Sequence, residues 1–167
     1  MAIGLSKKLG ECGATTKKPR VLGLFDCVAH YEVNAVQGPY LSISGVDRLD
    51  GCRKVGIVVA YVYHDPQGRG SDSNGITYHD GHIISPGDAL PCEELLKHCR
   101  PIVKVLEGWP DEPINSAKRA KDAPLPVGVQ DLIGTIEHFT GATVISIGNG
   151  PGPDDLIYIK RKCDKVV

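Results

Sequence analysis

The sequence predicts a mixed α/β or α+β domain, and three observations support this. Residues 55–63 form a β-branched and aromatic run without helical periodicity, which predicts a buried strand. Residues 129–139 carry apolar side chains at helical spacing and end before Gly141, which predicts an amphipathic helix. A chain of 167 residues is long enough for one domain with its own core. Periodicity alone leaves the order of the strands open.

Capping and turn residues predict the other elements. Residues 1–10 resemble the end of a helix, and Asp26 is a good N-cap for a helix that ends at Gly38. Residues 40–44 alternate in polarity as a strand does. Asp80-Gly81 predicts a tight turn that joins two short strands into a hairpin. These two strands are expected at 76–78 and 82–84, a helix at 92–99, strands at 101–106, 143–147 and 156–159, and a long surface connection at 110–126.

Composition excludes several classes of protein. The formal net charge is −1, without the basic excess of a general nucleic-acid or membrane-surface binder. No apolar run reaches the 18 residues or so of a membrane span, and the N-terminus lacks the apolar core of a secretory signal. The six cysteines form no C-x-x-C pair, which favours free thiols over a disulfide framework. We therefore expect a cytoplasmic protein without a membrane or nucleic-acid partner.

The first candidate site is the loop at residues 13–20, which reads Gly-Ala-Thr-Thr-Lys-Lys-Pro-Arg. Its two hydroxyl groups and three cations suit an anionic group, and Arg20 can bind a carboxylate or phosphate through two parallel hydrogen bonds. The alternative interpretation is a solvated basic loop without a ligand.

Two further candidates follow predicted strands. At 148–153, glycines would let backbone amides approach a ligand closely, although no Gly-Lys-Ser/Thr follows as in a Walker loop. The alternative there is a simple turn. Asp47, just past the strand at 40–44, offers two oxygens to a base edge that carries N–H donors. Its alternative role is to cap an Asx-type turn.

Taken in order, these segments resemble the adenylosuccinate synthase family. No single motif is decisive, but six in the right order cover nearly the whole chain. They lie at 11–20, 23–29, 47–51 with the strand that ends at 59–61, 106–110, 136–141 and 145–151.

The resemblance covers the C-terminal portion of the family and implies a single domain at 1–167. It implies an α/β fold, the C-terminal part of the adenylosuccinate synthase fold, with mixed strands, a few helices and long loops. The family is a ligase of AMP biosynthesis that joins L-aspartate to IMP, using GTP and Mg²⁺ through a 6-phosphoryl intermediate.

The family's phosphate-binding loop and catalytic residues precede the matching region. The resemblance therefore implies no catalytic residue and no Mg²⁺ ligand in this chain, which alone is expected to be inactive. A separate chain could supply the N-terminal half, and a homo-oligomer is expected.

The resemblance also assigns binding residues. Thr15, Thr16, Lys18 and Arg20 match the aspartate-binding loop, with Lys17 where the family usually has glycine and Lys18 where it has arginine. The residues that match the base-binding positions are Asp47, Ser146, Gly148, Gly150 and Pro151.

Departures from the family pattern leave other functions open. Gly45 stands where a lysine is expected, and the loop after Ser146 is slightly longer. Both features are similar to phage-type relatives that make 2-aminoadenylosuccinate from dGMP with an adenine nucleotide as donor. A different class of function is a non-catalytic remnant or a regulatory nucleotide-binding module. The sequence leaves open GTP against ATP or dATP, and IMP against dGMP.

Overall fold

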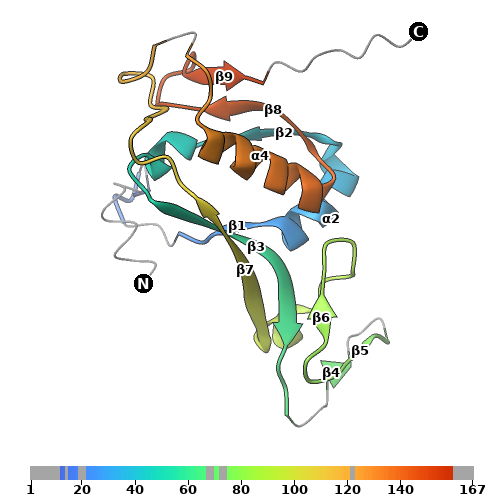
Figure 1. Ribbon diagram of the computed structural model, residues 1–167. Helices are drawn as coiled ribbons and strands as arrows, with labels where there is room; N and C mark the ends of the chain where they lie inside the picture. The colour runs from blue at the N-terminus through green and yellow to red at the C-terminus, as the bar shows by residue number, and fades with distance from the viewer. Residues whose placement is uncertain are drawn as a thin grey trace, which may run out of the picture.

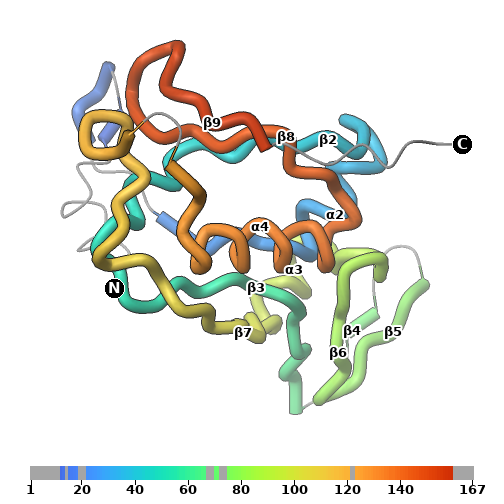
Figure 2. The backbone as a smooth tube through the Cα atoms, turned by 45° about the horizontal axis from the view of Figure 1, so that its top comes forward, coloured from blue at the N-terminus to red at the C-terminus, as the bar shows by residue number. Residues whose placement is uncertain are grey.

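The computed structural model describes residues 12–13, 15–18, 22–66, 70–71, 75–120 and 123–159. Two sheets enclose a layer of helices, as Figures 1 and 2 show. Helix α4 (Val127–Thr140) lies between the sheets, beside helix α2 (Cys27–Gln37). The helix expected at 1–10 lies outside the described residues.

Helix α2 begins at the predicted cap. The Asp26 carboxylate accepts hydrogen bonds from the backbone amides of Val28 at 3.0 Å and Ala29 at 3.1 Å. These bonds satisfy amides that have no partner within the helix. The helix ends at Gly38, whose φ of 92° favours glycine. The predicted cap and end are both confirmed.

The first sheet is built around the long strand β3 (Lys54–Tyr63). Strand β7 (Cys99–Glu107) pairs antiparallel with β3 along its whole length. The other edge of β3 pairs first with β1 (Phe25–Asp26), in parallel, and then with β6 (Ile83–Ile84), antiparallel. The strand predicted from the β-branched run at 55–63 is therefore confirmed. The short helix α3 (Glu93–Leu96) precedes β7.

The predicted hairpin around Asp80-Gly81 is wrong in its pairing. A turn does form there, with the His82 amide bonded to the His79 carbonyl at 2.9 Å. However, β5 (Thr77–Tyr78) pairs with β4 (Gly70–Ser71), and β6 pairs with β3. The predicted turn is therefore confirmed, but the pairing of the strands on either side of it depends on contacts distant in sequence.

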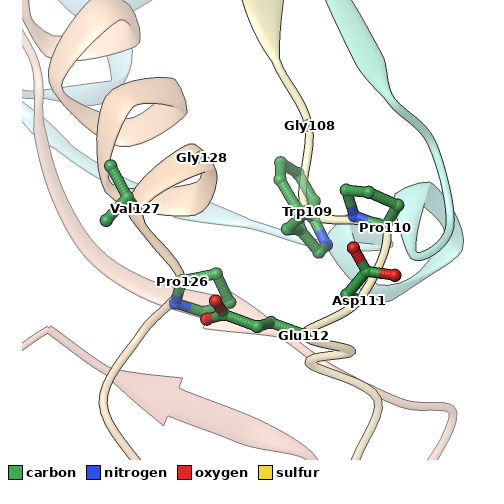
Figure 3. Close-up of a pocket in the computed structure, with 8 residues that line it drawn as sticks. All are labelled: Gly108, Trp109, Pro110, Asp111, Glu112, Pro126, Val127 and Gly128. Carbon is green, nitrogen blue, oxygen red and sulfur yellow. The ribbon is translucent and has the colours of Figure 1, made fainter.

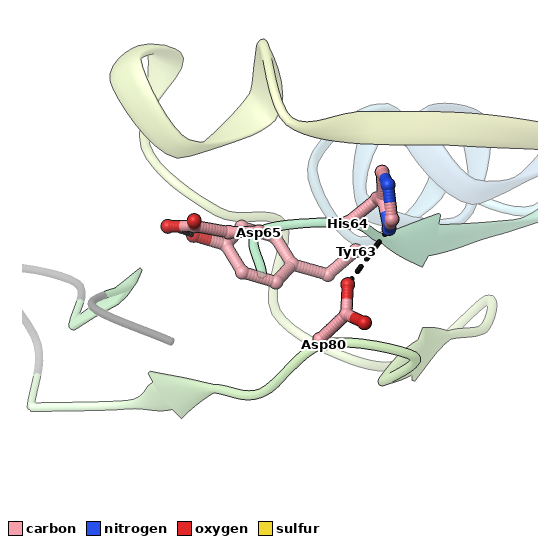
Figure 4. Close-up of polar contacts among 4 residues, drawn as sticks. All are labelled: Tyr63, His64, Asp65 and Asp80. Atoms are coloured by element: carbon pink, nitrogen blue, oxygen red, sulfur yellow. Dashed lines mark hydrogen bonds and ion pairs between the residues drawn. The ribbon is translucent and has the colours of Figure 1, made fainter. Parts of the chain in front are cut away.

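The end of β3 explains this pairing. The backbone of Tyr63 bonds to both sides of the turn, its amide to the His82 carbonyl at 2.8 Å and its carbonyl to the Gly81 amide at 2.9 Å. Figure 4 shows the His64 ring directed at Asp80, with Nδ1 2.7 Å from Oδ1. The Tyr63 hydroxyl donates to Asp65 at 3.4 Å. The long strand thus offers the turn a hydrogen-bonding edge that β5, with two residues, cannot provide.

The second sheet contains β2 (Tyr40–Ile43), β8 (Thr143–Gly148) and β9 (Leu156–Tyr158). Strands β2 and β8 run parallel, and β9 returns antiparallel to β8. Because neighbouring parallel strands end at the same edge of a sheet, the segments after β2 and β8 meet. The segment after β2 contains the short 3₁₀-helix η1 (Val46–Leu49).

The core lies where α4 meets both sheets. Helix α4 contributes the face that periodicity predicted, and its C-cap Gly141 is left-handed, as expected. Within the described ranges, none of the helices combines the length and apolarity needed to span a bilayer. The buried residues of the main core are Cys27, Val46, Val55, Ile57, Trp109, Ile114, Val129, Leu132, Ile133, Ile136, Val144 and Ile147.

Candidate functional site

The predicted base-binding residues lie at the shared carboxyl ends of β2 and β8. At position 148 a Cβ atom would lie 3.3 Å from the Cα of Ser44 and 3.6 Å from the amide nitrogen of Gly45. The segment that leads to Asp47 and the loop that begins at Gly148 are therefore in contact. Ligands of open parallel sheets bind at this kind of edge.

Asp47 is half-buried in η1, which begins after the left-handed Gly45 with a φ of 73°. Its backbone carbonyl accepts the Asp50 amide at 3.2 Å, which closes the turn. Its side-chain Oδ2 accepts a hydrogen bond from Nδ2 of Asn115 at 3.1 Å. Within the described part of the chain, Oδ1 has no hydrogen-bond donor. This oxygen and the second lone pair of Oδ2 can accept hydrogen bonds from a ligand.

Asp50 joins this site to the long connection at 110–126. Its carboxylate accepts from the indole Nε1 of Trp109 at 2.8 Å and from the backbone amides of Ile114 and Asn115, each at 3.0 Å. The Gly-Trp turn of the family motif thus has a packing role. A Cβ atom at Gly108 would collide with the carbonyl oxygen of Cys52, so only glycine fits there.

The loop after β8 is fixed to the same connection. The carbonyl of Asn149 accepts the Ser116 amide at 2.7 Å, and its Nδ2 donates to the Ile114 carbonyl at 3.0 Å. Its Oδ1 is buried and has no partner among the residues that the structure describes. A Cβ atom at Gly150 would crowd the Asp155 carboxylate and lie 2.6 Å from Oγ of Ser116, so a larger residue there would require these side chains to shift. A pocket of about 290 Å³ opens here, lined by Ser116, Arg119, Asn149, Asp154, Asp155, Leu156 and Ile157.

Ser146 and Pro151 lie at the two ends of the predicted base-binding segment. Ser146 is buried, and its hydroxyl is hydrogen-bonded to that of Ser42 on β2 at 2.7 Å. Pro151 is exposed. The sequence motif at 47–51 contains Asp50 but predicts no role for it. No role was predicted for Asn115 or Asn149 either. Asn115 lies in a polar connection without periodicity, so no sequence signal could have identified it.

The predicted aspartate-binding loop is only partly described. Thr15, Thr16 and Lys18 are exposed, and Arg20 lies outside the described residues. The amide of Gly13 donates to the carbonyl of Lys18, and the amide of Lys17 donates to the carbonyl of Gly13, both at 2.9 Å. Lys17 has a φ of 55°, a left-handed conformation that favours glycine. The structure therefore explains why glycine suits position 17, and it leaves the hydroxyls of Thr15 and Thr16 at the surface.

A second, smaller pocket of about 140 Å³ lies beside the N-terminus of α4 (Figure 3). Asp111 and Glu112 line it, opposite Pro126 and Val127. In the ranges that the structure describes, no three histidine, cysteine or carboxylate side chains are grouped as a metal site would require.

Comparison with known proteins identifies the family of this chain. The family model described as adenylosuccinate synthetase matches residues 1–157. The adenylosuccinate synthetase of Leishmania infantum is 55% identical over 161 residues, which are 96% of this chain and 23% of that protein. The adenylosuccinate synthetase of Trypanosoma brucei gambiense is 57% identical over 161 residues, 96% of this chain and 27% of that protein. The chain thus spans about a quarter of the length of these curated relatives.

The fold has a counterpart among solved structures. The structure of fully ligated adenylosuccinate synthetase from Plasmodium falciparum matches with a TM-score of 0.75 and 24% identity, covering 95% of this chain and 34% of that chain. This similarity confirms the predicted fold class, a mixed α/β architecture that matches part of the adenylosuccinate synthetase fold. With the family model matched over residues 1–157, the chain belongs to the adenylosuccinate synthetase family.

Proposed function

We propose that this chain binds the base of the nucleotide donor at the carboxyl ends of β2 and β8, and L-aspartate at the loop at 13–20. Both activities serve the GTP-dependent ligation of IMP and L-aspartate in AMP biosynthesis. The observation that carries the proposal is the contact between the segment holding Asp47 and the loop that begins at Gly148. Two segments about 100 residues apart in sequence thus form one edge, of the kind at which ligands of open parallel sheets bind.

Asp47 gives the site its selectivity in this proposal. Its two carboxylate oxygens complement the N1–H and N2–H₂ donors of guanine. Adenine presents an acceptor at N1, which would face a carboxylate lone pair. A site built to hydrogen-bond a donor rejects an analogue that lacks it, because its polar atoms lose their partners.

The test is a competition experiment in which calorimetric titration measures the binding of GDP and ADP to the 167-residue chain. Wild type should prefer GDP, and Asp47→Asn should reduce that preference about 10-fold or more, since a hydrogen bond to a charged group contributes about 1.5–3 kcal/mol. Asp88→Asn is the matched control, because Asp88 is exposed and only caps a turn at Ser85. An unchanged preference in Asp47→Asn would show that the aspartate only shapes the turn.

For the aspartate substrate, we propose Thr15, Thr16, Lys18 and Arg20 as the binding residues. The exposed hydroxyls of the two threonines and the cation of Lys18 support this proposal, because a dicarboxylate needs donors at the surface. Lys18 retains the positive charge of an arginine but not its two parallel hydrogen bonds. We expect Lys18→Arg to bind L-aspartate more tightly than wild type.

An adenine nucleotide donor is the second candidate, and Gly45 favours it. A lysine at this position would stack on a guanine ring in the pattern that the resemblance implies, whereas Gly45 leaves that face uncovered. The longer loop after Ser146 could also reshape the pocket. In the competition experiment, tighter binding of ADP than GDP by wild type would support this donor.

Phosphoryl transfer requires a phosphate cradle and groups that hold Mg²⁺. Because the chain spans about a quarter of the length of its curated relatives, we propose that protein outside these 167 residues supplies them. Either another part of a longer polypeptide or a separate chain could do so. The remaining features we propose for the assembled enzyme are a homo-oligomer and a cytoplasmic location.

A further inference from the structure

We infer that Asn115 is a positioning residue that orients the carboxylate of Asp47 for base recognition, and that Asp50 in turn holds Asn115. This inference rests on the proposed function, because it concerns the same base-binding site. It assigns a role in nucleotide selectivity to the long connection at 110–126.

The orientation of the Asn115 amide is fixed from both ends. One terminal atom of the side chain accepts a hydrogen bond from the backbone amide of Ala117 at 3.1 Å. This atom must be the oxygen Oδ1, because the NH₂ group of an amide only donates. Its Nδ2 therefore faces Asp47 and donates to Oδ2 at 3.1 Å. The backbone amide of Asn115 donates to Oδ2 of Asp50 at 3.0 Å. Two of these three hydrogen bonds hold Asn115 against η1 and its C-cap Asp50, and the third fixes its side chain within the connection.

This contact acts on the rotation of the Asp47 carboxylate. The terminal torsion of an aspartate is broad and has no sharp preferred value, so an isolated carboxylate rotates freely. A donor fixed on Oδ2 selects one orientation of the carboxylate plane. The two oxygens can accept hydrogen bonds from two adjacent N–H groups of a base only when the carboxylate plane is aligned with the base. The hydrogen bond from Asn115 favours one such orientation. Preorganisation of this kind reduces the entropy lost on binding.

A purely structural role for Asn115 makes a different prediction. Asp50 already links the connection at 110–126 to the site through Trp109 and through the Ile114 and Asn115 amides. None of these bonds uses the Asn115 side chain. Removing that side chain therefore leaves the link intact, and only the positioning role predicts a change in base selectivity.

The experiment measures the dissociation constants of GDP and IDP for the full 167-residue chain. The two differ only in the 2-amino group, so their ratio reports whether both Asp47 oxygens are used. Asn115→Ala should weaken GDP binding about 3- to 10-fold, the scale of one net hydrogen bond, and IDP binding less. Asn115→Asp keeps the acceptor for the Ala117 amide but puts a second carboxylate beside Asp47, so its GDP affinity should fall further.

Asn34→Ala is the matched control, because Asn34 Nδ2 donates to the Thr140 carbonyl at 2.8 Å between α2 and α4. It should leave the ratio unchanged. In an Asp47→Asn background, Asn115→Ala should have no further effect on the ratio. If Asp47→Asn lowers the GDP preference but folded Asn115→Ala and Asn115→Asp keep the wild-type ratio, the inference is overturned and the proposed function stands. If Asp47→Asn has no effect, or wild type does not bind GDP, both are overturned.

Discussion

Gly45 shows how one backbone conformation limits the residues that a turn can use. Its φ of 73° and ψ of 18° are left-handed, and this residue opens η1 two positions before Asp47. Residues with a Cβ atom lose about 1–2 kcal/mol in this conformation. A lysine here, as the resemblance to the family led us to expect, would therefore strain the turn that positions Asp47.

We predict that Gly45→Ala lowers the free energy of unfolding by about 1 kcal/mol. The cost comes from the backbone alone, since a Cβ atom would lie 3.6 Å from the Arg48 side chain, an ordinary contact. Urea denaturation measures the change. Gly134→Ala is the control: it lies on exposed helix with open space around it, and alanine there should stabilise by about 0.5–1 kcal/mol. Equal shifts in both variants would contradict the backbone argument.

At the scale of elements, Asp26 joins α2 to the first sheet. Besides capping the helix, its carboxylate accepts a hydrogen bond from the Tyr61 hydroxyl of β3. Burial, and then this hydrogen bond, raise the pKa of Tyr61 above its ordinary value of 10.0. Burial and the negative charge of Asp26 likewise raise the pKa of Cys27 from 9.0 to about 11.

These shifts predict a loss of stability in alkaline solution. Above pH 10 the unfolded chain releases the Tyr61 proton while the folded chain retains it, so the folded state binds more protons and the free energy of unfolding falls as pH rises. The contribution is complete below pH 10 and lost above it. Urea unfolding at several values from pH 8 to 11 should show a smaller fall in Tyr61→Phe than in wild type.

Some alkaline loss should remain in Tyr61→Phe. The pKa of the Tyr63 hydroxyl is also raised, chiefly by burial. The variant also retains Cys27, whose pKa is raised by burial and by Asp26. An identical pH profile in wild type and Tyr61→Phe would mean that the contact with Asp26 does not persist in solution.

At the scale of the whole molecule, α4 connects two sheets that share no strand. Its buried side chains pack with Val55 and Ile57 of the first sheet and with Val144 and Ile147 of the second. In Figure 2 this helix runs between the two layers. Loss of its packing should therefore weaken both sheets together.

We predict that Ile136→Ala, at a side chain that is 1% exposed, lowers the free energy of unfolding by about 3–4 kcal/mol. Unfolding should stay a single transition, because the helix contacts both sheets. Val127→Ala is the control on the same helix, since Val127 is 72% exposed and should change stability by less than about 0.5 kcal/mol. Separate transitions for the two sheets in Ile136→Ala would show that they fold independently.

The sequence by itself determined the elements whose causes are local. The Asp26 cap, the glycines that end α2 and α4, the apolar face of α4 and the β-branched run of β3 were each predicted from neighbouring residues. Ordered motifs were also sufficient to indicate the family, because six matched segments need no knowledge of contacts. Such signals depend on steric and hydrogen-bonding preferences within a few residues.

Only the tertiary structure decided which of these elements meet. It pairs β6 with β3 instead of β5, because the long strand offers more hydrogen-bonding partners. It also brings Asn115 to Asp47 across 68 positions of sequence, through a connection that has no periodicity. Contacts of this kind depend on packing between distant segments, which composition and spacing do not encode locally. The base-binding residues were therefore predicted from motifs, whereas the hydrogen bond between Asn115 and Asp47 is evident only in the fold.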